Sequence, residues 1–256
     1  MLSPSYLPSS PLHGRAARFW SPRDLPAGPS IWLDARRADL MSLGPDGIAH
    51  WGDASGAGHH AAQTVPALRP AYVADALDGL PGISCDNAFL TFPGFALTGP
   101  FESFALFRPD LMALDGAYPR YLVSNGSGYQ SNARKPFFYA WDQRPGEIRL
   151  GAGSYVGAYA LAPGSRLLSF RSTHTGVTLH VDGTPVLHDP TAQPPQAGIA
   201  SGMIGAQDSR AVWGEMLIFA GTLSAQDRSR VEGYLAHRWN LSGQLPPSHP
   251  HADRRP

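Results

Sequence analysis

The chain has 256 residues, of which 43% are hydrophobic, and its formal net charge at pH 7 is zero. A chain of this length and composition can build the core of one large β domain or of two small ones. Its basic residues form only short groups such as Arg36-Arg37 and Arg254-Arg255, so no nucleic-acid-binding surface is expected. The single cysteine, Cys85, excludes an internal disulfide and a cysteine-based metal site.

Residues 1–24 are rich in Pro, Ser and Arg, which is typical of an extended arm. Its apolar side chains Tyr6, Leu7, Phe19 and Trp20 are costly to leave exposed. The arm is therefore interpreted either as a docking segment for attachment or assembly, or as a disordered tail.

The sequence shows neither a secretion signal nor a membrane-spanning segment. The N-terminal segment lacks the continuous apolar stretch of a signal peptide. No run of the chain reaches the length of a membrane span. We therefore expect synthesis in the cytoplasm without membrane insertion.

From Ser30 onward, short β-type runs alternate with turn signals. The run Val177–Val181 alternates apolar and polar residues and ends in Asp182-Gly183, a strong hairpin signal. The expected strands are Ile31–Leu33, Gly47–Trp51, Ala71–Val73, Gly82–Cys85, Phe89–Phe92, Ser103–Phe107, Tyr121–Val123, Phe137–Trp141, Ile148–Leu150, Leu167–Arg171, Val177–Val181, Thr184–Leu187, Met203–Ile204 and Met216–Phe219. This spacing predicts an all-β, antiparallel two-sheet jelly-roll sandwich over residues 25–245, followed by a Pro/His-rich tail over residues 246–256.

The segment after the last strand predicts one C-terminal α-helix. Ser224 occupies the N-cap position, and Asp227 follows three residues later as a variant of the capping box. The apolar residues Val231, Tyr234, Leu235 and Trp239 then repeat at helical spacing and form one stripe. Gly233 costs about 1 kcal/mol relative to Ala within a helix, so its small size is expected to allow close packing against a neighbour.

Four stretches resemble the concanavalin A-like lectin/glucanase superfamily in its laminin-G-like branch, which is common in bacterial and phage proteins. They are Ile31–Ala35, Trp51–Ala61, Leu179–Gly183, and the strand-helix segment that ends at Leu245-Pro246. The resemblance covers about residues 25–250, except for residues 95–165. It implies a jelly roll that binds carbohydrate or protein, and for some members hydrolysis of glycans; the fold alone does not give the function.

The sequence does not favour an enzyme. The hydrolytic branch of the superfamily carries an E-x-D-x-x-E strand, and this chain has only four glutamates and no such motif. Asp142 and Glu147 flank a turn and could face each other as a catalytic pair, although solvated turn carboxylates are the simpler interpretation. A polysaccharide hydrolase or lyase therefore stays the alternative function.

The polar and aromatic middle of the chain is the expected ligand site, because aromatic faces and planar polar groups suit sugars and protein interfaces. Its candidates are Tyr129, Asn132, Tyr139, Trp141, Asp142, Arg149, Tyr155 and Tyr159. Phe137, Tyr139 and Trp141 have strand spacing, so core packing is an open alternative for them. Tyr155 and Tyr159 lie among glycines and are expected to make exposed loop contacts.

Metal binding is a minor expectation. Asp86 and Asn87 with backbone carbonyls fit the calcium sites of the resembling superfamily, and no other cofactor is indicated. His59 and His60 are expected to form hydrogen bonds within a turn, as is Asp53. The tail residues His249 and His251 are expected to lie in solvent.

These observations predict a non-catalytic carbohydrate-recognition module. A lectin-type domain without a secretion signal or disulfides suits a fibre or spike of a phage-like particle or gene transfer agent, which assembles in the cytoplasm and is freed by lysis. Its expected partners are a host cell-surface glycan and, through residues 1–24, other particle proteins; a homo-oligomer is compatible with this. A purely structural adaptor in the particle is a further alternative.

Overall fold

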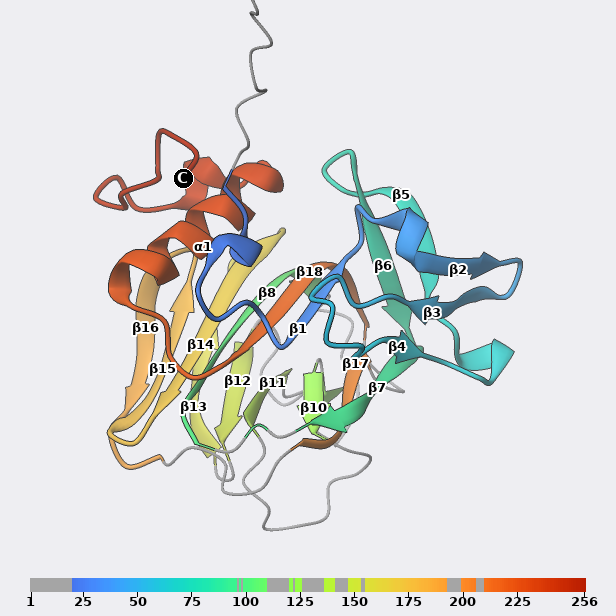
Figure 1. Ribbon diagram of the computed structural model, residues 1–256, viewed down its shortest axis with the longest axis horizontal. Coiled ribbons are helices and arrows are strands. Elements are labelled where there is room, and N and C mark those ends of the chain that lie inside the picture. Colours follow the sequence, from blue (N-terminus) through green and yellow to red (C-terminus); the bar gives the residue numbers. More distant parts are fainter. Residues whose placement is uncertain are drawn as a thin grey trace, which may run out of the picture.

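The computed structural model describes residues 20–95, 97, 99–109, 120–121, 123–125, 136–140, 147–152, 155–192, 199–205 and 210–256. Its largest sheet has eight antiparallel strands in the order β16-β15-β14-β8-β18-β6-β5, with β1 also paired to β18 (Figure 1). The strands are β1 (Ile31–Asp34), β5 (Ala71–Leu77), β6 (Leu80–Asp86), β8 (Phe101–Pro109), β14 (Arg166–Thr173), β15 (Gly176–Val181), β16 (Thr184–Asp189) and β18 (Arg210–Ala220).

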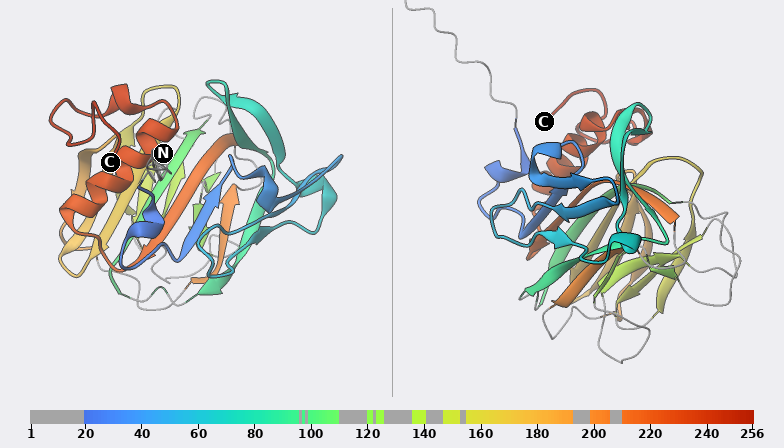
Figure 2. Two further views of the ribbon diagram at one scale, coloured as in Figure 1. Left: turned by 45° about the horizontal axis from the view of Figure 1, so that its top comes forward. Right: turned by 90° about the vertical axis from the view of Figure 1, so that its right-hand side faces the viewer.

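Two smaller antiparallel sheets complete the sandwich (Figure 2). One has the order β10-β17-β7-β4-β3-β2 and contains β2 (Met41–Gly44), β3 (Gly47–Trp51), β4 (Ala61–Ala62), β7 (Phe89–Phe95), β10 (Val123–Asn125) and β17 (Ile199–Gly205). The other has the order β13-β12-β11-β9 and contains β9 (Arg120–Tyr121), β11 (Pro136–Ala140), β12 (Glu147–Ala152) and β13 (Tyr155–Ala160). The predicted all-β antiparallel sandwich is therefore confirmed.

The central strands of the large sheet are buried on both faces. In β18, every residue from Trp213 to Phe219 is buried, and β8 is buried from Phe101 to Phe107. Continuous apolar runs of this kind are typical of strands covered on two sides. Helix α1 lies over one face of the large sheet and contacts β14 there (Figure 1).

Helix α1 (Ala225–Arg238) is the predicted C-terminal helix. The Ser224 hydroxyl accepts a hydrogen bond from the Asp227 backbone N–H at 3.0 Å and donates one to the Asp227 carboxylate at 2.8 Å. Of the predicted stripe, Val231 and Leu235 are fully buried, and Trp239 caps the C-terminus. No helix in the described part of the chain is long and apolar enough to cross a membrane.

Short 3₁₀ helices complete the secondary structure: η1 (Pro22–Asp24), η2 (Ala38–Leu40), η3 (Pro66–Leu68) and η4 (Ser242–Gln244). Residues 1–19 of the predicted arm lie outside the described residues. From Trp20 onward the chain packs on the domain, because the Trp20 ring meets Tyr234 edge to face at 6.1 Å and Leu25 is buried.

The C-terminal tail differs from the sequence expectation. His249 is buried rather than solvated, and its Nε2 atom lies 3.3 Å from a carboxylate oxygen of Glu232. Gly233 leaves the space for this part of the tail, since a Cβ atom built there would lie 2.4 Å from the Cβ atom of His251. The absent side chain thus lets the tail cross the helix in close contact, as expected from its size.

Candidate functional site

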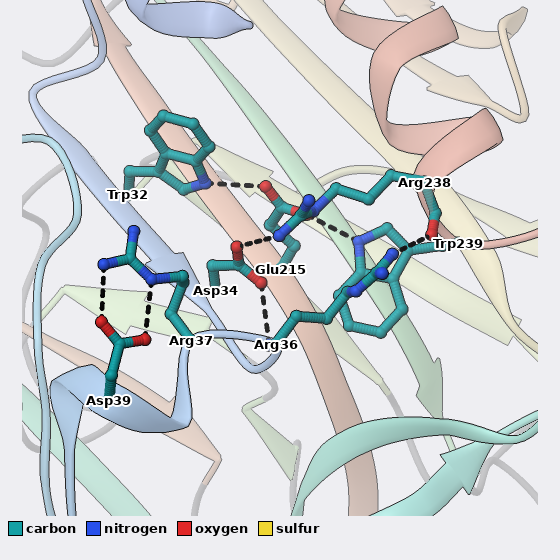
Figure 3. Close-up of polar contacts among 8 residues, drawn as sticks. All are labelled: Trp32, Asp34, Arg36, Arg37, Asp39, Glu215, Arg238 and Trp239. Carbon is teal, nitrogen blue, oxygen red and sulfur yellow. Dashed lines mark hydrogen bonds and ion pairs between the residues drawn. The ribbon is translucent and has the colours of Figure 1, made fainter. Parts of the chain in front are cut away.

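A buried polar cluster joins the large sheet to helix α1 (Figure 3). Glu215 on β18 is fully buried, and its two carboxylate oxygens accept hydrogen bonds from the indole N–H groups of Trp32 at 2.7 Å and Trp239 at 2.6 Å. Strand β1 pairs with β18, which brings Trp32 to this position. The cluster thus fixes the start of the β-sandwich against the end of the helix.

Arg238 enters the same cluster from the last turn of α1. Its guanidinium donates to Asp34 at 2.5 Å, and its Nε atom lies 3.3 Å from Glu215 (Figure 3). Asp34 in turn accepts from the Arg36 backbone N–H at 2.9 Å, while the Arg36 guanidinium donates to the Arg238 carbonyl at 2.6 Å. Both carboxylates are buried and held by donors, so they orient Arg238 and do not face a substrate.

Burial raises the pKa of Glu215 to about 8, and the neighbouring carboxylate of Asp34 adds to this increase. The guanidinium of Arg238 and the two indole N–H groups oppose it. A carboxyl that is removed from water loses the hydration of its charged form. Folding therefore raises the pH at which Glu215 loses its proton.

The outer side of Arg238 borders a small cavity. Its volume is about 210 Å³, and its lining residues are Trp20, Arg36, Tyr234, Arg238, Arg255 and Pro256. We call it the aromatic pocket. Trp20 and Tyr234 are only half-buried and supply ring surface, and the Arg238 guanidinium lies 5.7 Å from the Tyr234 ring centre. Ring faces with fixed N–H donors suit a ligand that has both C–H and oxygen surfaces.

Part of the predicted site lies outside the described residues, namely Tyr129, Asn132, Trp141 and Asp142. Tyr139, Arg149 and Tyr155 lie in β11, β12 and β13, although their side chains are outside the described part of the structure. The assignment of these residues to ligand binding stays a prediction.

The strand register bears on the position of Tyr139. Tyr139 is paired with Tyr121 on one side and with Arg149 on the other. Ile148, the neighbour of Arg149, is paired with Tyr159 and is buried in the core. Because successive residues of a strand alternate between faces, the backbone places the positions of Tyr139 and Arg149 on the sheet face opposite to that of Ile148.

Tyr155 and Tyr159 lie in strand β13 and not in a loop, and their contact with a ligand stays a prediction. Tyr159 is half-buried and packs against the core. Gly157 lies between them within the strand. A Cβ atom at this position would lie 3.2 Å from the Leu187 side chain of β16. The glycine therefore permits close packing of β13 on the neighbouring sheet.

The predicted calcium ligands are partly committed to other contacts. The exposed carboxylate of Asp86 accepts from Arg210 at 2.8 Å and from the Asn87 amide at 3.3 Å. Calcium takes six to eight oxygen ligands, and the described residues contain no group of three or more His, Cys, Asp or Glu side chains suited to a metal ion. These two residues alone do not fit such an ion, and the site stays a prediction.

The expected turn around Asp53 is confirmed. Its carboxylate accepts from the backbone N–H groups of Trp32 and Ser55, both at 2.8 Å, and of His59 at 3.0 Å. His60 accepts from the Asp53 N–H at 2.9 Å. The Gly-rich segment is thus a structural element that holds β1, and both histidines form turn hydrogen bonds as expected.

The sequence reasoning missed the buried cluster. Neither Glu215 nor Arg238 belongs to the predicted site. One signal was available, since Glu215 directly precedes the apolar run Met216–Phe219 and follows Trp213-Gly214. A carboxylate inside such a run requires buried donors, although the sequence does not identify them.

Comparisons with known proteins add information on the fold. Neither a protein-family model nor a curated protein matches the chain, so the assignment to the concanavalin A-like superfamily stays a prediction. The binding domain of botulinum neurotoxin serotype G is similar at 10% identity and a TM-score of 0.57, over 84% of this chain and 51% of that chain. The binding domain of Paraclostridial Mosquitocidal Protein 1 is 14% identical with a TM-score of 0.51, over 78% and 51%.

An enzyme is also among the similar structures. A family 54 α-L-arabinofuranosidase is 11% identical with a TM-score of 0.51, over 72% of this chain and 50% of that chain. The chain thus spans about half the length of these solved structures. At such low identity the similarity shows a shared fold, which occurs in binding domains and in an enzyme alike.

Proposed function

We propose that this chain is a non-catalytic recognition module that binds a carbohydrate receptor through the aromatic pocket. The observation that carries the proposal is the pocket itself, in which Trp20 and Tyr234 offer rings beside the guanidinium of Arg238. Aromatic rings pack against the C–H surfaces of sugars, and a fixed guanidinium donates to their oxygens.

The solved binding domains named above share the fold with this chain, but the arabinofuranosidase shares it too. One observation on the pocket favours recognition over hydrolysis. In the pocket, the acids behind Arg238 are Asp34 and Glu215, which are 2% and 0% exposed. Acids that a sugar does not reach cannot protonate a glycosidic oxygen or attack its carbon.

The test is glycan-array and host-cell binding with the wild-type chain and Trp20→Ala. We expect Trp20→Ala to lower the binding signal about ten-fold, the usual size for loss of one stacking ring. Tyr72→Ala is the matched control, because Tyr72 is also half-buried but lies on β5 at the far edge of the large sheet. An unchanged signal in Trp20→Ala, or no glycan bound by the wild type, contradicts the proposal.

We further propose that the module is a fibre or spike component of a phage-like particle or gene transfer agent. It would be made in the cytoplasm and released with the particle, with the N-terminal arm as its attachment segment. Deleting residues 1–19 should abolish co-purification with particles while the isolated protein still binds glycan, because Trp20 is retained. Particle association without the arm contradicts this role.

The enzymatic alternative has its own test. Incubation with host polysaccharide followed by an assay for new reducing ends should give no signal. A signal that disappears in Asp142→Asn or Glu147→Gln would replace recognition by hydrolysis.

A further inference from the structure

A second cavity lies between helix α1 and the C-terminal tail. Its volume is about 660 Å³, and Arg228, Arg230, Glu232, His249, His251 and Arg254 are among its lining residues. We call it the α1–tail groove. The chain as a whole has no net charge, so three arginines around one groove form a local excess of positive charge.

The acidic groups near the groove do not neutralise this charge. Glu232, the one carboxylate among the described lining residues, is 2% exposed. Its oxygens already interact with the Ser169 hydroxyl at 2.9 Å and with His249 at 3.3 Å. Asp227 does not line the groove, and of the three arginines it pairs with Arg230, whose Nη1 atom lies 3.5 Å from the Asp227 carboxylate.

Arg228 is a half-buried arginine of the groove whose partner is not a carboxylate. Its Nη1 atom lies 2.8 Å from the Nε2 atom of His180, while its buried Nε atom has no acceptor. Burial and the charge of Arg228 lower the pKa of His180 to about 4, so this imidazole is a neutral acceptor at pH 7. Among the described residues no carboxylate forms an ion pair with Arg228, although the buried carboxyl of Glu102, which pairs with Arg171, interacts with its charge from further away. A half-buried guanidinium without a directly bonded counterion is costly, and an anion in the groove would lower that cost.

We propose that the α1–tail groove binds the anionic groups, carboxylate or sulfate, of an acidic polysaccharide. This rests on the proposed function and names the class of its ligand. Consecutive residues of the tail line the two cavities: Arg254 lines the groove and Arg255 lines the aromatic pocket. One polysaccharide chain can therefore place a sugar ring in the pocket and an acidic group in the groove.

The experiment uses three probes with the same backbone: dextran, carboxymethyl dextran and dextran sulfate. Binding to the full-length protein is measured by calorimetry at two salt concentrations. We expect both charged probes to bind more tightly than dextran, and added salt to weaken them. The double variant Arg228→Gln/Arg254→Gln should lose roughly ten-fold or more in affinity for the preferred charged probe, as expected for lost charge-assisted contacts.

The control is Arg37→Gln/Arg210→Gln, which removes two arginines that are 42% and 51% exposed and lie in surface ion pairs. It changes the net charge by the same amount as the double variant. Its affinity for the charged probe should change less than two-fold, which is under about 0.4 kcal/mol. Arg254→Gln alone covers the case in which the double variant does not fold, because Arg254 is exposed, and a several-fold loss is then expected. The ratio of the affinities for carboxymethyl dextran and dextran sulfate identifies the preferred anion.

Equal losses in the double variant and its control, or no loss in the double variant, overturn the proposal. Tighter competition by single-stranded DNA than by either charged dextran also overturns it, because the groove would then favour a nucleic acid. Glycan-array binding that depends on Trp20 but not on Arg228 and Arg254 leaves the proposed function standing while the groove proposal fails. Absence of any glycan binding removes the proposed function itself.

Discussion

Two buried carboxylates illustrate how differently this chain uses the same functional group. Asp53 is ringed by backbone N–H donors from its own Gly-rich turn, with only Trp32 coming from another strand. Glu215 depends on side chains that are far apart in the sequence, the indoles of Trp32 and Trp239. Local hydrogen bonding therefore made the role of Asp53 predictable from sequence, whereas the role of Glu215 requires the folded chain.

Glu215 gives the protein a defined pH dependence. A carboxyl whose pKa rises from 4.5 to about 8 on folding stabilises the folded state fully below pH 4.5, and this contribution is lost as the pH rises through 8. We expect the free energy of unfolding to fall between pH 6.5 and pH 8.5. The share due to Glu215 is about 2 kcal/mol, measured by urea denaturation at each pH.

The control for this prediction is Glu215→Gln. Burial also raises the pKa of Glu102 to about 7, so the wild-type protein loses stability in this range from two groups. The variant should be less stable overall, because an amide accepts from only one of the two indoles, yet it should lose about 2 kcal/mol less between the two pH values. An identical pH dependence in both proteins would show that Glu215 does not titrate in this range.

At the scale of elements, helix α1 is defined by its contact with the tail as much as by its apolar stripe. The stripe predicted the buried face with Val231 and Leu235. It did not predict that Glu232, at the edge of the same face, is buried between Ser169 of β14 and His249 of the tail. Helical periodicity identifies the face toward the sheet, but a second layer formed by a short coil segment leaves no periodic signal.

Gly233→Ala tests this packing. Replacing a helical glycine by alanine ordinarily stabilises a helix by about 1 kcal/mol. Here the new methyl group would lie 2.4 Å from the Cβ atom of His251, so the tail must move. We expect the substitution to lower the melting temperature of the full chain instead of raising it. A raised melting temperature would mean that the tail does not hold this position.

At the scale of the whole molecule, most strands and the helix were predictable because turns and periodicity are local signals. Strand β3 (Gly47–Trp51) begins and ends as predicted, whereas β2, β4 and β13 were missed. Strand β4 has two residues, and β13 contains Gly157, so neither shows a clear alternating pattern. The aromatic pocket was missed for another reason, since it brings Trp20, Tyr234 and Arg255 together from both ends of the chain.

The same closure of chain ends predicts that the C-terminal tail is part of the domain. Ending the chain at Leu245 removes His249 from the buried carboxylate of Glu232 and uncovers Gly233. The truncation also removes the packing of buried His249 on helix α1, so we expect a clear drop in melting temperature by calorimetry. Within the shortened chain the clash with His251 is gone, and Gly233→Ala should then stabilise by about 1 kcal/mol. A reversal of sign between the two backgrounds assigns the effect to the helix–tail contact; the same sign in both would assign it to the helix alone.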